Sequence, residues 1–155
     1  MTGKLSGKVA LVTGGSAGIG LGIAKRFAEE GARVFITGRR QSELDKAVTA
    51  IGGGATAVQG DVSNLDDLDR IYATIKDKAG HADVLAVNAG YYEFGSFGEI
   101  TEEHFDKTFN TNVRGLLFTV QKAALDRRGV GDPRRLDRLD QRLPVLFGVQ
   151  CEQGL

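Results

Sequence analysis

Short apolar runs alternate with helix-like patterns along most of this chain, and this alternation constrains the fold more than any other feature of the sequence. The first run, Val9–Thr13, is almost continuously apolar and leads directly into a glycine-rich turn, as expected of a strand buried on both faces of a parallel sheet. Further strands are expected at Arg33–Thr37, Ala55–Gln59 and Asp83–Val87. Because parallel strands need helical crossovers, the pattern predicts an α/β domain: a doubly wound parallel sheet of about four strands with helices on both faces.

The segments between the strands carry apolar side chains at helical spacing. Ile19, Ile23 and Phe27 recur every four residues and would form the inner face of the first helix, which ends at the capping glycine Gly31. Serines are expected to cap the N-termini of the next two helices, Ser42 and Ser63.

A long fourth helix is expected to begin at Thr101. Apolar side chains would share one of its faces: Phe105, Phe109, Val113, Leu116 and Val120. A sheet of only about four strands would leave a strand edge and an apolar helix face uncovered. Such a surface favours association.

Composition narrows the functional classes. The chain has 155 residues, which suits one domain, and its 20 basic residues balance 20 acidic ones, so neither nucleic acid nor an anionic membrane is an expected partner. The lone cysteine, Cys151, cannot form an intramolecular disulfide, which fits a reducing cytosol. No apolar run reaches the length of a membrane span, and the N-terminus has no signal-peptide core. A cytoplasmic protein is therefore expected, and no residue is proposed as a metal ligand.

The glycine turn Thr13–Gly20 lies directly between a strand and a helix, and this position gives it chemical meaning. Glycines at 14, 18 and 20 allow a tight turn that brings backbone N–H groups and a helix N-terminus to a pyrophosphate. A side chain at Gly18 would hold the phosphates away. The alternative is a tight loop without a ligand, but the strand and helix on either side favour phosphate binding.

Two arginines follow the second strand where an acidic residue would select NAD. An acid there would bind the ribose 2′-hydroxyl and repel a 2′-phosphate. This chain has Arg39 and Arg40 instead, and two guanidiniums can bind a phosphate through charge-assisted hydrogen bonds. The alternative is that both are ordinary surface charges. The pair favours NADP(H) over NAD(H).

The spacing Thr-Gly-x-x-x-Gly-x-Gly from Thr13 resembles that of the short-chain dehydrogenase/reductase family. Further segments resemble family motifs in the same order along the chain: Gly60–Val62, Val87–Gly90 and Asn110–Val113. The resemblance covers residues 5 to about 123. It implies an NAD(P)-binding Rossmann domain over residues 1–123, followed by an atypical tail over residues 124–155.

The resemblance also implies an activity and a set of site residues. Family members are oxidoreductases that move a hydride between the nicotinamide and an alcohol or carbonyl substrate, and they commonly form dimers or tetramers through the long helix. Asn112 would be the catalytic-set residue that is present, and Asp61 would bind the adenine. The implied cofactor-binding residues are Gly14, Ser16, Gly18, Ile19, Gly20, Arg39, Arg40, Asp61, Val62, Asn88, Ala89 and Gly90.

Several candidates have structural alternatives. Asp61 could cap the following helix, and Asn88 could satisfy backbone groups in its turn, which is also part of its family role. Asn112 is unfavourable in the middle of a helix, so a hydrogen-bonding role is expected. For Tyr91 and Tyr92 two roles stay open, contact with the substrate and packing against neighbouring residues.

The family's catalytic tyrosine and lysine are missing from the chain. No Tyr-x-x-x-Lys follows Asn112, and no fifth strand is predicted. The segment Leu125–Arg142 holds six of the chain's twelve arginines without a strand or helix pattern, so an irregular or disordered tail is expected. A helix over Arg134–Leu143 is the alternative.

Codon degeneracy suggests a cause. If the tail were read one base later, the codons of Val149–Gln150 could encode tyrosine, those of Gln153–Gly154 lysine and those of Leu136–Asp137 serine, at the family's spacing. The hypothesis is a reading-frame slip near Ala123–Leu125, in the gene or in its recorded sequence, and the coding DNA tests it. The 155-residue chain is expected to have no turnover. The rival functions are a non-catalytic dinucleotide-binding module, an inactive truncated remnant and a misfolded fragment.

Overall fold

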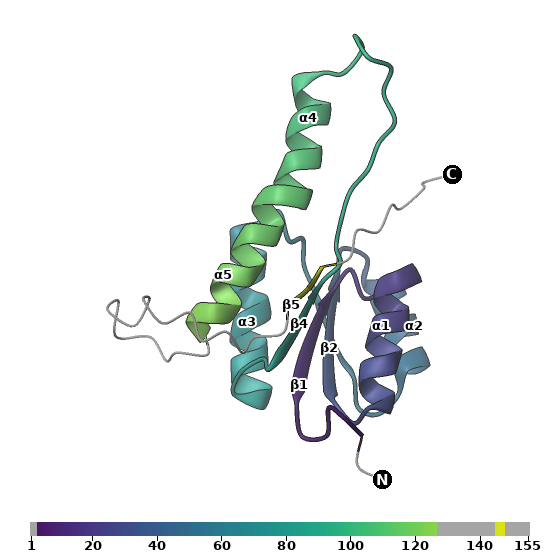
Figure 1. Cartoon of the computed structure of the whole chain (residues 1–155), viewed down its shortest axis with the longest axis vertical. Helices are drawn as coiled ribbons and strands as arrows, with labels where there is room; N and C mark the ends of the chain where they lie inside the picture. Colours follow the sequence, from purple (N-terminus) through teal and green to yellow (C-terminus); the bar gives the residue numbers. More distant parts are fainter. Residues whose placement is uncertain (1–2, 127–144, 148–155) are drawn as a thin grey trace.

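A single parallel sheet forms the centre of the molecule, and helices cover both of its faces (Figure 1). The computed structural model describes residues 3–126 and 145–147. The strands are β1 (Val9–Thr13), β2 (Arg33–Gly38), β3 (Thr56–Gln59), β4 (Val84–Val87) and β5 (Val145–Phe147). Their order is β3-β2-β1-β4-β5 with parallel pairing throughout. This order is that of a doubly wound sheet, so the predicted fold class is confirmed.

The short strand β5 corrects one expectation from the sequence, because no strand was predicted in the tail. Val145 pairs with Leu85, and Phe147 pairs with Val87. Three apolar residues give no periodic signal of their own, and the open edge of β4 supplies the backbone partners that make them a strand. Residues 124–126 of the predicted tail continue the preceding helix. The rest of the tail, including the alternative helix, lies outside the described residues.

Alternate residues of each strand face opposite helical layers, as the period of two requires. On one face, α1 (Gly18–Glu29) and α2 (Gln41–Ile51) pack over Val12 and Ile36. On the other, α3 (Leu65–Ala79) contributes buried side chains that pack with Leu11. The buried strand residues are almost entirely aliphatic, so the sheet is the hydrophobic centre of the fold.

The helix N-termini differ from the expected serine caps. Arg40 stands at the N-cap of α2, so Ser42 lies inside the helix. Asn64 caps α3 by accepting hydrogen bonds from two backbone N–H groups of the first turn, and Ser63 lies in the loop before it. The predicted helix start at Thr101 is confirmed, since its hydroxyl caps the following turn. Several small polar residues compete near each start, and only the folded loop decides which one caps.

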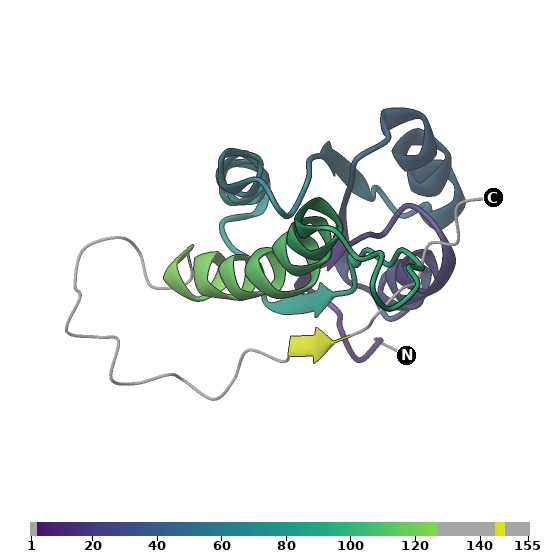
Figure 2. The same ribbon diagram turned by 90° about the horizontal axis from the view of Figure 1, so that it is seen from above.

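The long fourth helix is interrupted by a π-helical segment. Figure 2 shows the three parts as one continuous green rod: α4 (Glu102–Phe109), the π-helix η1 (Asn110–Gly115) and α5 (Leu116–Asp126). The predicted single apolar face is therefore split. Leu116 and Val120 pack on the core, whereas Phe105, Phe109 and Val113 are exposed. The extra residue in a π-turn changes the phase of the helix, and α4 also extends past the end of the sheet (Figure 1).

Candidate functional site

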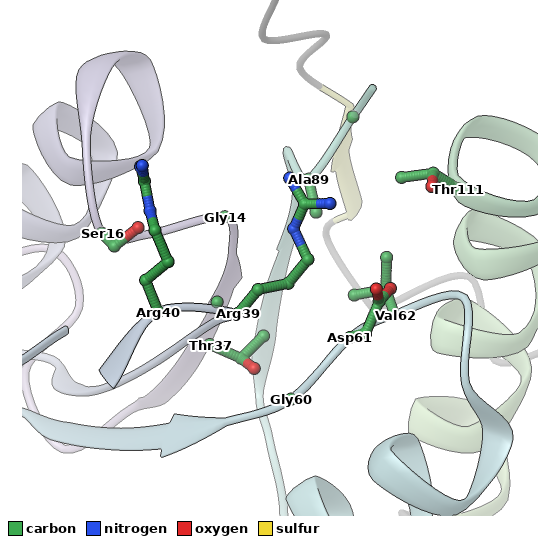
Figure 3. Close-up of a pocket in the computed structure, with 12 residues that line it drawn as sticks. Gly14, Ser16, Thr37, Arg39, Arg40, Gly60, Asp61, Val62, Ala89 and Thr111 are labelled. Carbon is green, nitrogen blue, oxygen red and sulfur yellow. The ribbon is translucent and has the colours of Figure 1, made fainter. Parts of the chain in front are cut away.

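A pocket opens at the carboxyl ends of the strands, where the strand order reverses (Figure 3). Its walls come from the turn after β1, the end of β2, the loops after β3 and β4, and the π-helix η1. The lining residues are Gly14, Ser16, Thr37, Gly38, Arg39, Arg40, Gly60, Asp61, Val62, Ala89, Gly90 and Thr111.

The glycine turn leaves no room for a side chain at Gly14 or at Gly20. Gly14 has φ +65°, and a Cβ added there would lie 2.9 Å from the Cα of Ala89. A Cβ on Gly20 would lie 2.1 Å from the carbonyl oxygen of Gly14. The turn delivers the chain into α1, whose N-cap, Ala17, has no side-chain hydrogen bond and whose first turn has no acidic residue. Uncapped N–H groups at a helix start suit an anionic ligand.

Hydrogen bonds of Asn88 join this turn to the end of β4. It is fully buried, and its Nδ2 donates hydrogen bonds to the carbonyl oxygens of Thr13 (3.3 Å) and Gly14 (3.2 Å). In return, the Thr13 hydroxyl accepts hydrogen bonds from the backbone N–H groups of Asn88 (3.0 Å) and Ala89 (3.1 Å). Asn88 does not line the pocket; it holds together two of the segments that do.

Two guanidiniums lie over the pocket. In Figure 3 the Arg40 guanidinium lies toward Ser16, and that of Arg39 lies toward Ala89. Among the lining residues Asp61 supplies the one carboxylate, so the charges around the pocket sum to positive. A site of this sign attracts a phosphate.

A buried hydroxyl is also available at this pocket. Thr37 lines it, and the Thr37 Oγ1 has no hydrogen-bond partner among the described residues. Buried polar atoms are almost always satisfied, so an unpaired one beside a pocket fits a polar ligand. The tight glycine turn, the two arginines and this hydroxyl together suit a phosphorylated dinucleotide.

The loop after β3 forms the third wall, and hydrogen bonds fix its shape. The Asp61 carboxylate accepts from the N–H (2.9 Å) and hydroxyl (2.7 Å) of Ser63, while the Asp61 N–H donates to the Asp67 carboxylate (2.8 Å). That N–H, followed by the nearby Arg70, holds the pKa of Asp67 below its ordinary value. The alternative role of Asp61 as a helix cap is wrong, because Asn64 caps α3.

Asn112 makes the hydrogen bonds expected of an asparagine in the middle of a helix. Its side chain accepts from the Tyr91 N–H (2.8 Å) and donates to the Tyr91 carbonyl (2.7 Å). Tyr91 follows Gly90, and Asn112 follows Thr111, so this pair joins two lining segments. The Tyr91 ring itself lies under Lys107 with 4.3 Å between the ammonium and the ring centroid.

Most of the predicted cofactor residues come together at the pocket, and the others lie around it. Gly18, Ile19 and Gly20 begin α1, with Ile19 exposed, whereas Tyr92 packs edge-on against Phe94 outside the pocket. The lining also includes residues that the sequence interpretation did not propose as cofactor contacts: Thr37, Gly38, Gly60 and Thr111. The available signal was proximity in the sequence, since each lies within two residues of a proposed site residue.

Two absences apply to the described part of the chain. Residues 3–126 and 145–147 contain no cluster of three or more histidine, cysteine, aspartate or glutamate side chains that could hold a metal ion. Within the same ranges, no helix combines the length and apolar character needed to cross a membrane.

The doubly wound sheet and the pocket at its switch point are typical of α/β nucleotide-binding domains. The model of the short chain dehydrogenase family matches residues 8–131. The chain belongs to this family of oxidoreductases.

Similar proteins support the assignment. The chain is 50% identical over 120 residues to oxidoreductase asL5 of Sarocladium schorii, covering 77% of this chain and 48% of that protein. It is 36% identical over 118 residues to galactitol 2-dehydrogenase of Agrobacterium fabrum, covering 76% and 46%. Among solved structures, L-sorbose reductase from Gluconobacter frateurii, solved with NADPH and L-sorbose, matches with a TM-score of 0.77 and 30% identity over 83% of this chain and 50% of that one. The chain thus spans about half the length of these relatives.

Proposed function

We propose that the pocket binds NADP(H) in preference to NAD(H), and that the whole protein transfers a hydride between this cofactor and a small alcohol or carbonyl compound. The observation that carries the proposal is the pair Arg39 and Arg40 over a pocket that a glycine turn opens. The NADPH named with L-sorbose reductase supports it. A cytoplasmic location stays part of the proposal, on the lone Cys151.

Each wall of the pocket would hold a different part of the cofactor. The N–H groups of the turn at Gly14–Gly20 would bind the pyrophosphate. Arg39 and Arg40 would bind the 2′-phosphate, Asp61 would contact the adenine, and Asn88–Gly90 would lie along the centre of the molecule. When bound, the nicotinamide supplies the hydride chemistry.

The 155-residue chain is proposed to bind the cofactor without turning a substrate over. It has Asn112 but no Tyr-x-x-x-Lys after it, so no tyrosine in that pattern can exchange a proton with the substrate. By itself the chain would then behave as a dinucleotide-binding module, which is the rival function. Binding without turnover distinguishes this state from a misfolded fragment, which would bind nothing.

Calorimetric titration of the 155-residue chain with NADP⁺ and NAD⁺ tests the cofactor proposal. NADP⁺ is expected to bind at least about tenfold more tightly, because charge-assisted hydrogen bonds to a phosphate contribute roughly 1.5–3 kcal/mol. The double variant R39A/R40A should lose this preference. The matched control is R33A, which removes an arginine from the opposite end of β2, where it donates to the Lys78 carbonyl. Equal affinity of the wild-type chain for both cofactors would contradict the proposal.

We also propose that copies of the chain associate as dimers or tetramers through an exposed apolar stripe on the rod. The stripe consists of Phe105, Phe109, Val113 and Leu117, which recur every four residues and are about half exposed. Uncovered apolar patches of this kind commonly mark interfaces. Light scattering should show an oligomer that the double variant F109S/V113S converts to a monomer. The control F97S changes an exposed phenylalanine off the stripe, and an unaltered mass in both variants would refute the interface.

A further inference from the structure

Arg114 connects the rod to the wall of the pocket that the loop after β3 forms. It belongs to η1, and its Nη1 donates a hydrogen bond to the carbonyl oxygen of Ser63 (2.7 Å), 51 residues earlier in the chain. The same Ser63 donates two hydrogen bonds to the Asp61 carboxylate at 2.9 and 2.7 Å. We propose that Arg114 is a positioning residue that sets the place of Asp61 and Val62 in the pocket. The proposal rests on the proposed function, because it concerns how this pocket meets its nucleotide.

A second contact joins η1 to the same wall. Gly115 is buried, and a Cβ added there would lie 2.9 Å from the carbonyl oxygen of Val62. The helix backbone therefore packs directly on the loop that Arg114 holds by its side chain. Two adjacent residues of η1 thus fix the loop Gly60–Ser63, one by a hydrogen bond and the other by close contact.

The opposite side of η1 holds the other wall. Asn112 forms its paired hydrogen bonds with Tyr91, next to Gly90, and Thr111 lines the pocket itself. This short π-helical segment consequently joins the wall after β3 to the wall after β4. π-helical turns occur often at functional sites, and here the local geometry lets neighbouring residues reach two different loops.

The segment is itself anchored in the core. The hydroxyl of buried Thr119 donates to the Gly115 carbonyl (2.6 Å), and the Tyr72 hydroxyl on α3 donates to the Thr119 carbonyl (2.7 Å). The Arg114 guanidinium lies 5.5 Å from the centre of the Phe118 ring one turn later, which restricts its orientation. A rigid anchor and an oriented side chain are what a positioning role requires.

Fragment binding separates this role from general stability. The 155-residue chain is titrated with NADP⁺ and with 2′,5′-ADP, which carries the adenine and the 2′-phosphate but no nicotinamide. R114M removes the donor and keeps the apolar stem, and it should weaken both ligands by about fivefold, the effect of one hydrogen bond. R114K, which keeps a charged donor on a long stem, should retain affinity within about twofold. N112A loosens the other wall and should weaken NADP⁺ while sparing 2′,5′-ADP.

The outcomes distinguish the two proposals. If the wild-type chain binds neither ligand, the proposed function fails. If the wild-type chain binds both and R114M binds them equally well, the positioning role of Arg114 is overturned. Urea unfolding of R114M is expected to match wild type closely, since Arg114 is exposed. A loss of affinity in R114M that R114K does not restore would also count against the role.

Discussion

Apolar residues are buried in the sheet but exposed in the segment that follows β4. The arm, Tyr91–Phe109, holds two of the chain's three tyrosines and four of its eight phenylalanines, yet none of its residues is fully buried. Phe97 is 102% exposed, whereas Phe35 in β2 is 0% exposed. Strand residues are buried because their neighbours and two helical layers cover both faces of the sheet. The arm extends past those layers, so its aromatic content indicates a surface for contact rather than a core.

The largest expected effect comes from shortening one apolar side chain in the core and one in the arm and comparing the two losses of stability. Ile71→Ala on α3 removes a fully buried side chain and should lower the free energy of unfolding by roughly 2–5 kcal/mol. Phe105→Ala in the arm should change it by less than about 0.5 kcal/mol in the monomer. Urea unfolding at low protein concentration measures both. A comparable loss in the two variants would mean that the arm is also part of the core.

The glycine turn gives the next largest effect, and the chain provides a matched control within the same helix. Gly20→Ala places a Cβ against the Gly14 carbonyl, so it should cost roughly 1–3 kcal/mol of stability and weaken NADP⁺ binding by more than about tenfold. Gly22→Ala meets nothing within 4 Å. It should stabilise the helix by about 0.5–1 kcal/mol and leave binding unaltered. Thermal unfolding measures the stability of the two variants, and calorimetry measures their binding of NADP⁺. Equal stability and equal affinity in both would contradict this prediction.

Two tyrosine hydroxyls allow a buried hydrogen bond to be compared with an exposed one. Tyr72→Phe leaves the buried carbonyl of Thr119 without its hydroxyl partner and should cost about 1 kcal/mol. Tyr91→Phe removes a hydroxyl that contacts Glu93 in the exposed arm, and less than about 0.5 kcal/mol is expected. Chemical denaturation measures both variants, and equal losses would argue against the contrast.

The smallest expected effect is a pH dependence. The pKa of Asp67 is lowered in the folded protein by the Asp61 N–H and then by Arg70, so its contribution to stability is present above the ordinary aspartate pKa and is lost as the pH falls through the lowered value. Asp67→Asn should therefore lower the urea midpoint at neutral pH, and the difference from wild type should begin to shrink below about pH 4 and vanish below the lowered pKa. A difference that persists unchanged in acid would contradict this account.

The carboxylate of Glu93 in the arm provides the comparison for Asp67. Hydrogen bonding from the Tyr91 hydroxyl, together with Lys107, lowers the pKa of Glu93, but Glu93 does not line the pocket. Asp67→Asn should weaken NADP⁺ binding by about twofold to fivefold at neutral pH, because it removes the negative charge that strengthens the hydrogen bond from the Asp61 N–H. Glu93→Gln should leave that affinity unchanged. Equal effects on binding would mean that the arm takes part in the pocket.

Much of the fold could be predicted because its signals are local. Val9–Thr13 and the glycine turn after it lie side by side in the sequence, and their geometry follows from burial and the absence of Cβ atoms. The helix caps were less predictable, since Ser63 and Asn64 are both suitable residues. No local sequence pattern indicated the π-helical segment. The strand β5 depends on pairing with β4, which is distant in the chain.

By itself the sequence determined the alternation of strands and helices, the glycine turn, and the presence of two arginines where an acid would stand. These depend on neighbouring residues and on the backbone freedom of glycine. Only the tertiary structure decided that Asn112 meets Tyr91, that Arg114 meets Ser63, and that the aromatic residues of the arm stay exposed. The reason is that such contacts join segments far apart in the chain, and their geometry exists only after the layers have packed.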